Sequence, residues 1–245
     1  MSNPKFISEL QQLINESERI VFFGGAGVST ASGIPDFRSS KGLFMKESGY
    51  RISAEEIVSN CFFNRHPKIF FEFYFENLVY EKAQPNLVHK YIANLEKREK
   101  NIIIVTQNID GLHKKAGSTQ IFNLHGDIYS NYCTKCHRHY TLDELQLDSD
   151  GIPRCEDDQA IVKPDVILYG EQLHADVVEG AVQAIAQADL LIIAGTSLAV
   201  YPAAGLINHF NGKKVVVINN TLIRTYHLNT LFIEDDMTNV FKKLK

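Results

Sequence analysis

The sequence predicts an α/β fold in which a doubly wound, Rossmann-like parallel sheet carries a smaller inserted lobe. Short runs rich in β-branched and aromatic residues alternate with segments of helical periodicity, which is typical of a parallel sheet covered by helices. The first such run, RIVFFGGAG, leads directly into a glycine turn. Two longer stretches interrupt the alternation, and they indicate the smaller lobe.

The order of the elements supports this fold. Phe6, Leu10, Leu13 and Ile14 recur at helical spacing and predict an N-terminal amphipathic helix. Strands are then expected at residues 19–27, 101–108, 121–127, 166–171, 189–195 and 214–220. Helices are expected at residues 174–188 and 202–210, where they would cross between the last three strands.

The two interrupting stretches divide the chain into two domains. Residues 42–81 are predicted to be helical and are rich in aromatic side chains, while residues 128–163 are polar and contain a C-x-x-C pair. We expect these stretches to form a small domain, made of a helical module and a degenerate zinc-ribbon-like segment. Residues 1–41, 82–127 and 164–245 would then form the larger, Rossmann-like domain.

Composition narrows the classes of protein that fit. The 245 residues are 44% hydrophobic and 22% charged, with a formal net charge of −4, which suits one large core and a smaller module. The mild acidity argues against a nucleic-acid partner, which would favour a basic surface. No apolar run approaches the roughly 18 residues of a membrane span, and no signal-peptide pattern is present. Because the cysteine pattern favours a reducing compartment, we expect a cytoplasmic protein with no membrane partner.

The glycine turn, GGAGVSTASG, is typical of a dinucleotide-binding site. Gly25 and Gly27 would allow backbone N–H groups to approach a pyrophosphate closely, aided by the dipole of the next helix. Glycines also occur where a strand and a helix simply pack together, and the turn alone leaves both interpretations open. The following SGIPDFRSSKG indicates a partly non-helical loop. It would present Phe37 to a flat ring and Arg38 to a pyrophosphate, or else lie on the surface with Arg38 solvated.

Polar residues follow the second predicted strand. Gln107, Asn108 and Asp110 stand at the edge where open α/β sheets bind their ligands. The acidic residue that a dehydrogenase places about 20 positions after its glycine turn is not evident, which argues against the usual hydride chemistry. His125, at the end of the third predicted strand, is either a structural histidine or a catalytic one, and the residues alone leave both open.

Together these motifs resemble those of one family. GAGVSTASGIPDFRS, TQNIDGLH, LHGD and KPDVILYGE, followed by GTSL and INN, occur in the order and rough spacing of the sirtuins, the NAD-dependent protein deacylases. The resemblance covers essentially the whole chain. It implies an enzyme that uses NAD to remove acyl groups from lysine in proteins or peptides, releasing nicotinamide and O-acyl-ADP-ribose. The alternatives are mono-ADP-ribosyl transfer to protein, a non-catalytic NAD or ADP-ribose sensor, and a C-x-x-C redox protein.

The resemblance also implies roles for particular residues. His125 would be the general base that deprotonates a ribose hydroxyl, and Asn108 would help to place the ribose and a bound water. Besides these two, the residues that would contact NAD are Gly25, Ala26, Gly27, Thr30, Phe37, Arg38, Gln107, Ile109, Asp110, Thr196, Ser197, Asn219 and Asp236. Two amides and a carboxylate after the second strand suit a carboxamide and a polyhydroxylated sugar.

At the metal site the sequence departs from the family pattern. Many sirtuins bind a structural zinc on two C-x-x-C pairs. Here Cys133 and Cys136 form the first pair, and only Cys155 of the second pair remains. Either the cysteines are small buried residues without a metal, or a fourth ligand comes from Asp158, His137 or His139. Because a carboxylate in place of a thiolate weakens the site, we expect any bound zinc to be removed readily by a chelator.

The resemblance bears on the acyl group as well. Sirtuins that select acidic acyl chains resemble one another in a Tyr-x-x-Arg pair on a helix of the small lobe. The corresponding KIFFEFYFENL, residues 68–78, contains no arginine, and most of its phenylalanines would belong to the core. We therefore predict that acetyl and longer neutral acyl chains are preferred over succinyl.

Overall fold

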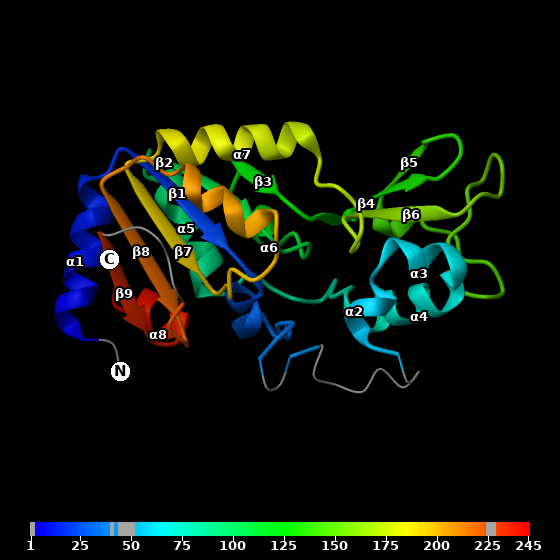
Figure 1. Ribbon diagram of the computed structural model, residues 1–245, viewed down its shortest axis with the longest axis horizontal. Helices are drawn as coiled ribbons and strands as arrows, with labels where there is room; N and C mark the ends of the chain where they lie inside the picture. The colour runs from blue at the N-terminus through cyan, green and yellow to red at the C-terminus, as the bar shows by residue number, and fades with distance from the viewer. Residues whose placement is uncertain (1–2, 40–41, 44–51, 224–228) are drawn as a thin grey trace.

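The computed structural model describes residues 3–39, 42–43, 52–223 and 229–245. Within these residues, six parallel strands form one sheet in the order β3-β2-β1-β7-β8-β9 (Figure 1). The strands are β1 (Arg19–Gly24), β2 (Asn101–Thr106), β3 (Ile121–Asn123), β7 (Leu190–Ala194), β8 (Lys214–Asn219) and β9 (Thr230–Glu234). The predicted doubly wound parallel sheet is confirmed, and its order reverses between β1 and β7.

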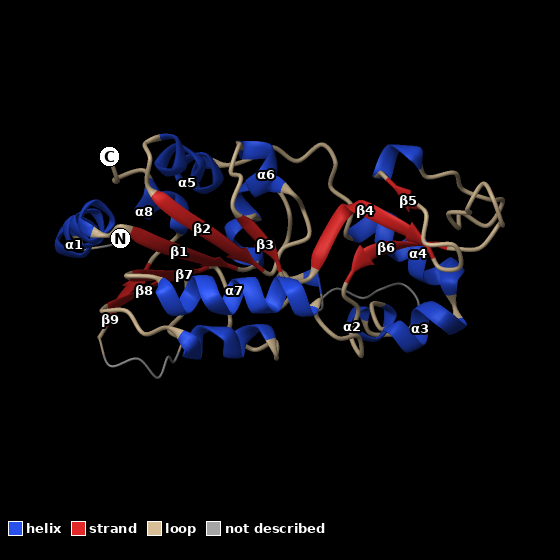
Figure 2. Ribbon diagram, turned by 90° about the horizontal axis from the view of Figure 1, so that it is seen from above, coloured by secondary structure: helices blue, strands red, loops and turns tan. Residues whose placement is uncertain are grey.

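Helices cover both faces of this sheet (Figure 2). Along β1, Ile20 and Phe22 face one layer, while Val21 and Phe23 face the other. The first layer is made of α1 (Pro4–Glu16), α5 (Leu87–Lys97) and α8 (Met237–Phe241), with α6 (Leu112–Ala116) beside α5. The second layer is made of α7 (Ala175–Gln187) and the 3-10 helix η5 (Ala203–His209).

A second sheet, antiparallel and ordered β5-β4-β6, forms the small lobe (Figure 1). Its elements are β4 (Gly126–Cys133), β5 (His139–Tyr140), the 3-10 helix η4 (Leu142–Glu144) and β6 (Val162–Val166). The helical module consists of α2 (Ala54–Ile57), α3 (Asn60–Arg65) and α4 (Pro67–Asn77). Four aromatic side chains of α3 and α4 pack with Ile128 of β4, namely Phe63, Phe70, Phe71 and Tyr74. The predicted helical module is therefore present, although residues 44–51 of its range lie outside the described residues.

Some of the predicted elements are wrong in detail. Residues 166–171 do not form a strand of the parallel sheet, because β6 ends at Val166 and pairs antiparallel with β4. The strand expected at 121–127 ends at Asn123, and its last two residues belong to β4. The predicted helix at 202–210 is the 3-10 helix η5. The outermost strand, β9, lies outside the predicted strands because it is a short apolar run with weak alternation.

A glycine marks the change from the large sheet to the small one. Gly126 has a φ of +80°, and a Cβ atom there would lie 1.8 Å from the carbonyl oxygen of Asp165. Only glycine fits this position, so the glycine of LHGD is a requirement of the chain path. The division of the chain into two domains stays a prediction. None of the helices in the described part of the chain combines the length and apolar character needed to cross a bilayer.

Candidate active site

A cavity of about 510 Å³ lies where the carboxyl ends of β1, β2 and β7 meet, at the reversal of strand order. Residues of the small lobe, including Val58 and Leu168, line its other side. The structure brings the predicted cofactor residues together here. All of them line the cavity except Asp110, which borders a smaller adjoining space beside Asn108.

The glycine turn packs against the loop after β7. A Cβ atom on Gly25 would lie 2.7 Å from the Thr196 Cβ, and one on Gly27 would lie 2.8 Å from the Gly195 Cα. The N–H groups of Gly25 and Gly27 donate to the carbonyls of Ala194 and Gly195, at 3.1 and 2.8 Å. The protein itself thus uses the N–H groups of the two glycines, and the approach of other backbone N–H groups of the turn to a pyrophosphate stays a prediction.

Residues 26–39, the described segment after the glycine turn, contain no long helix, so the predicted contribution of a helix dipole is wrong. The turn continues into two short 3-10 helices, η1 (Ala26–Val28) and η2 (Thr30–Ser32). Beyond them, the described part of the loop, residues 33–39, is non-helical, as its proline and glycines predict. This loop brings Phe37 and Arg38 to the cavity wall.

The polar residues after β2 form a hydrogen-bonded group with the glycine turn. Gly24 and Thr106 are partners in the parallel register of β1 and β2, so the segments that follow them lie side by side. The Ser29 hydroxyl donates to Asp110 Oδ2 at 2.5 Å and accepts from Asn108 Nδ2 at 3.0 Å. Ser29 was not among the predicted residues. Its only signal in the sequence is a hydroxyl in the glycine turn.

These bonds fix the side chains at the cavity edge. Asp110 Oδ1 also accepts from the Leu112 N–H at 2.9 Å. Burial raises the pKa of Asp110, and its hydrogen bonds to Ser29 and Leu112 oppose that effect. Gln107 Nε2 donates to the Thr196 hydroxyl at 3.1 Å, which joins the edges of β2 and β7. Amide and carboxylate groups are thus held in one orientation before any ligand binds.

His125 lies in the turn between β3 and β4 rather than at the end of a strand as expected. Its Nδ1 atom is 2.9 Å from the Gln107 carbonyl oxygen, which can only accept. The neutral ring therefore carries its proton on Nδ1 and a lone pair on Nε2. Burial lowers the pKa of His125, and the bond to Gln107 opposes this only in part. A half-buried, neutral imidazole on the cavity wall has the properties of a general base.

The remaining predicted residues stand further along the cavity. Arg38 pairs with Glu55 and donates to the Tyr169 hydroxyl, both at 3.2 Å, so it is not simply a solvated surface side chain. Asn219 donates to the Thr221 carbonyl at 3.0 Å. Asp236 caps α8 by accepting from the Thr238 N–H at 2.8 Å, which gives this carboxylate a structural role as well.

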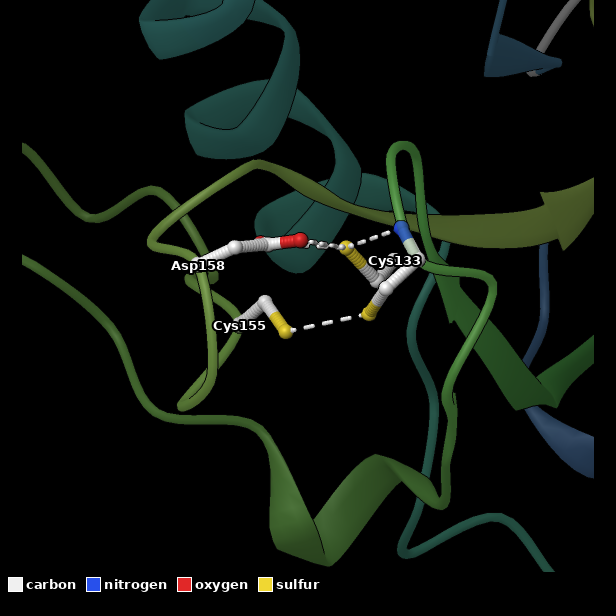
Figure 3. Close-up of side chains that lie close together, drawn as sticks. Cys133, Cys155 and Asp158 are labelled. Carbon is white, nitrogen blue, oxygen red and sulfur yellow. Dashed lines mark hydrogen bonds between the residues drawn. The ribbon is translucent and has the colours of Figure 1, made fainter.

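Outside the cavity, three cysteines and an aspartate converge in the small lobe (Figure 3). The ligand atoms of Cys133, Cys136, Cys155 and Asp158 all lie within 4.8 Å of one another. Cys136 Sγ is 3.6 Å from Cys155 Sγ, and Cys133 Sγ is 3.4 Å from Asp158 Oδ1. The backbone N–H groups of Lys135 and Cys136 donate to Cys133 Sγ, both at 3.4 Å, which would support a thiolate there.

Comparison with known proteins decides the family. The model of the Sir2 family matches residues 25–202. The chain belongs to the Sir2 family. It is 49% identical to an NAD-dependent protein deacetylase of Clostridium perfringens, over 97% of this chain and 98% of that protein. It is 41% identical to an NAD-dependent protein deacetylase of Staphylococcus aureus, over 97% of each chain.

Solved Sir2 structures share the fold. A Sir2 protein with a p53 peptide and NAD+ matches with a TM-score of 0.86 at 34% identity, over 97% of this chain and 96% of that one. A Sir2 protein bound to a propionylated peptide matches with a TM-score of 0.84 at the same identity and coverage. The predicted resemblance to the sirtuins is thereby confirmed.

The cysteine cluster of this Sir2 chain fits a zinc ion. In a tetrahedral thiolate site zinc lies about 2.3 Å from each sulfur, so the ligand atoms are roughly 3.8 Å apart. The two closest contacts in the cluster are close to that spacing. Among the described residues, the group that converges contains Asp158 and neither His137 nor His139. Zinc here would cross-link the end of β4 to the turn that precedes β6 and stabilise the small lobe.

We predict that this zinc is held less tightly than in a site of four cysteines. The protein as purified should contain up to one zinc per chain and should lose most of it in prolonged dialysis against a chelator, measured by elemental analysis. The reason is that a carboxylate is a harder ligand than a thiolate. The matched control is Asp158→Cys, which should retain its zinc under the same conditions. Full retention by the wild-type chain would contradict this prediction.

Proposed function

We propose that this Sir2 chain is an NAD-dependent protein deacetylase that transfers the acyl group of an acyl-lysine to ADP-ribose, releasing free lysine, nicotinamide and O-acyl-ADP-ribose. The observation that carries the proposal is His125. Its imidazole lines a cavity at the switch point of the sheet, is held by the Gln107 carbonyl and has a lowered pKa. Relatives that are named NAD-dependent protein deacetylases support the same activity.

The polar residues around His125 suit NAD. When bound, NAD would supply a ribose carbon open to attack and nicotinamide as its leaving group. Gln107, Asn108 and Asp110 offer donors and acceptors for the carboxamide and the ribose. The loop that presents Phe37 and Arg38 would cover the pyrophosphate. Thr196, Ser197, Asn219 and Asp236 would receive the adenosine end.

The role of His125 follows from its tautomer. With the proton of the neutral ring on Nδ1, the lone pair on Nε2 can take a proton from a ribose hydroxyl. The imidazolium that forms keeps its Nδ1–H donated to the Gln107 carbonyl, so the charge arises beside a fixed dipole. The hydrogen bond to the Gln107 carbonyl thus orients the imidazole before the proton transfer and stabilises the imidazolium after it.

The other substrate would be a lysine side chain of a protein or peptide. Solved Sir2 structures carry acetylated and propionylated peptides, which supports acyl-lysine peptides as substrates of this chain. Location in the cytoplasm stays a prediction from the cysteine usage.

A product assay tests the proposal. The chain is incubated with an acetyl-lysine peptide, with and without NAD, and products are identified by mass spectrometry. Free lysine peptide, nicotinamide and O-acetyl-ADP-ribose should appear together, and only with NAD. ADP-ribose attached to protein, with no O-acetyl-ADP-ribose, would indicate ADP-ribosyl transfer instead. NAD binding without any turnover would indicate a sensor.

The pH dependence should report the state of His125. Its pKa is lowered by burial below the usual 6.5, and the neutral ring is the active form. The value of kcat/KM for the acetyl peptide should therefore rise with pH through a midpoint below 6.5 and then stay level up to pH 8. The dissociation constant for NAD, measured separately at each pH, shows whether activity falls because His125 is protonated or because NAD binds less tightly. A rising limb centred above pH 7 would contradict this assignment.

A further inference from the structure

The loop that follows β6, residues 167–173, forms one wall of the cavity. Within it the backbone makes only an isolated bridge at Tyr169 and no regular strand or helix. The Ile167 N–H donates to the His125 carbonyl, and the Tyr169 N–H donates to the Val58 carbonyl, both at 3.0 Å. The loop therefore joins the catalytic turn to the helical module.

Its place in the cavity identifies the substrate it faces. The residues assigned to NAD come from the glycine turn, the cofactor loop, the edges of β2, β3, β7 and β8 and the start of α8, and none comes from residues 167–173. Because Ile167 bonds to the His125 carbonyl, the loop lies beside the base, where the acyl-lysine peptide would bind.

Glu171 gives the loop its internal support. Its Oε2 accepts from the Leu168 N–H at 2.9 Å, and its Oε1 accepts from Asn60 Nδ2 of α3 at 2.7 Å. The side chain is only 19% exposed. A carboxylate so far removed from water needs a cation beside it, because an unpaired buried charge is strongly unfavourable.

Lys163 supplies that cation from within the small sheet. Its side chain is 7% exposed, and Nζ lies 3.2 Å from Glu171 Oε2. Nζ also donates to the carbonyls of Val166 and Pro164, at 3.0 and 3.3 Å. These bonds use all three ammonium hydrogens, and the rings of Phe63 and Tyr132 lie about 6 Å away. Lys163 is therefore a buried lysine with all its donors bonded, and not a surface side chain.

We propose that Lys163 is a positioning residue for the acyl-lysine peptide. It fixes the charge and direction of Glu171, and Glu171 in turn fixes the backbone of residues 167–173 against His125. Without the ammonium group the carboxylate turns toward water, and Leu168 and Asn60 lose their acceptor. The peptide wall then shifts, while the glycine turn and the ends of β2, β7 and β8, which lie on other elements, keep their places. This inference rests on the proposed deacetylase activity.

The test is steady-state kinetics with Lys163→Met, which keeps the length of the side chain and removes its charge. The KM for the acetyl-lysine peptide should rise on the order of tenfold, which corresponds to about 1.4 kcal/mol, because the wall loses the acceptor of Leu168 and Asn60. The KM for NAD should stay within about twofold, because most of the residues assigned to NAD lie outside the loop. Lys163→Arg, which restores a cation, should recover most of the peptide affinity.

Two further variants control for instability. Lys68→Met removes the exposed ion pair with Asp150 in the same lobe and should leave both KM values unchanged. Glu171→Gln keeps an amide oxygen at the acceptor position but removes the charge that Lys163 holds. Because both oxygens of Glu171 accept, the amide also lacks one of the two acceptors. The variant should raise the peptide KM with little change in the NAD KM, so the proposal stays testable if Lys163→Met does not fold.

The outcomes separate this proposal from the function on which it rests. If the wild-type chain shows no NAD-dependent deacetylation, the proposed function fails and this inference with it. If the wild-type chain is active and Lys163→Met keeps the wild-type peptide KM, the positioning role alone is overturned. The same follows if the constants for NAD and peptide change equally, because that pattern indicates general loss of structure.

Discussion

Replacing His125 with alanine is expected to abolish deacetylation while leaving NAD bound. The base acts on a ribose hydroxyl once the cofactor is in place, so its loss should lower the rate on the order of 10²–10⁴-fold. The dissociation constant for NAD should stay within a few-fold, because the group around Ser29, Asn108 and Asp110 does not include the imidazole. Single-turnover rates and calorimetric NAD binding measure the two quantities separately.

His209→Ala is a suitable control for this variant. His209 is exposed at the end of η5 and does not line the cavity, so its removal should leave the rate unchanged. If His125→Ala turned over at a rate near that of this control, the assignment of the base would be wrong.

The second large effect concerns the acyl chain. The cavity wall includes the apolar side chains of Val58, Leu78 and Ile109. Among the described residues that line the cavity, Arg38 is the only lysine or arginine, and it is paired with Glu55. A succinyl carboxylate would be desolvated there without a partner, which is strongly unfavourable. We therefore expect kcat/KM for acetyl- and butyryl-lysine to exceed that for succinyl-lysine on the order of a hundredfold, or about 3 kcal/mol.

The preference can be tested with peptides that differ only in the acyl group. Leu78→Arg introduces a cation at the apolar wall and should raise the ratio of succinyl to acetyl turnover, whereas the uncharged Leu78→Met should not. Efficient removal of succinyl by the wild-type chain, at a rate comparable with removal of acetyl, would refute the predicted selectivity.

The parts of the fold that could be predicted from sequence are those that local pattern determines. β1, β2, β7 and β8 lie inside the predicted strands because each is a nearly continuous apolar run that is buried on both faces. The strand expected at 166–171 fails for a related reason. The run is apolar, but after Val166 its backbone bonds to the His125 turn and to Val58, which are long-range contacts that no local pattern contains.

In the candidate site too, some residues are predicted by local pattern and others depend on long-range contacts. Gln107, Asn108 and His125 follow strand ends, so the sequence indicates that they meet at one edge of the sheet. Ser29 escapes prediction, because its partners lie 79 and 81 positions away and meet it only through the register of β1 with β2. The hydrogen bonds of the Gly25 and Gly27 N–H groups could not be predicted either, because their acceptors belong to β7 and the loop after it.

The position of His125 between the two sheets has a mechanical consequence. Its ring is bonded to Gln107 at the edge of the large sheet, while its carbonyl accepts from Ile167 at the end of the small one. His125 is thus hydrogen-bonded to both lobes. Any opening of the lobes must strain one of these two bonds or turn the imidazole, so alignment of the base is coupled to closure of the molecule around its substrates.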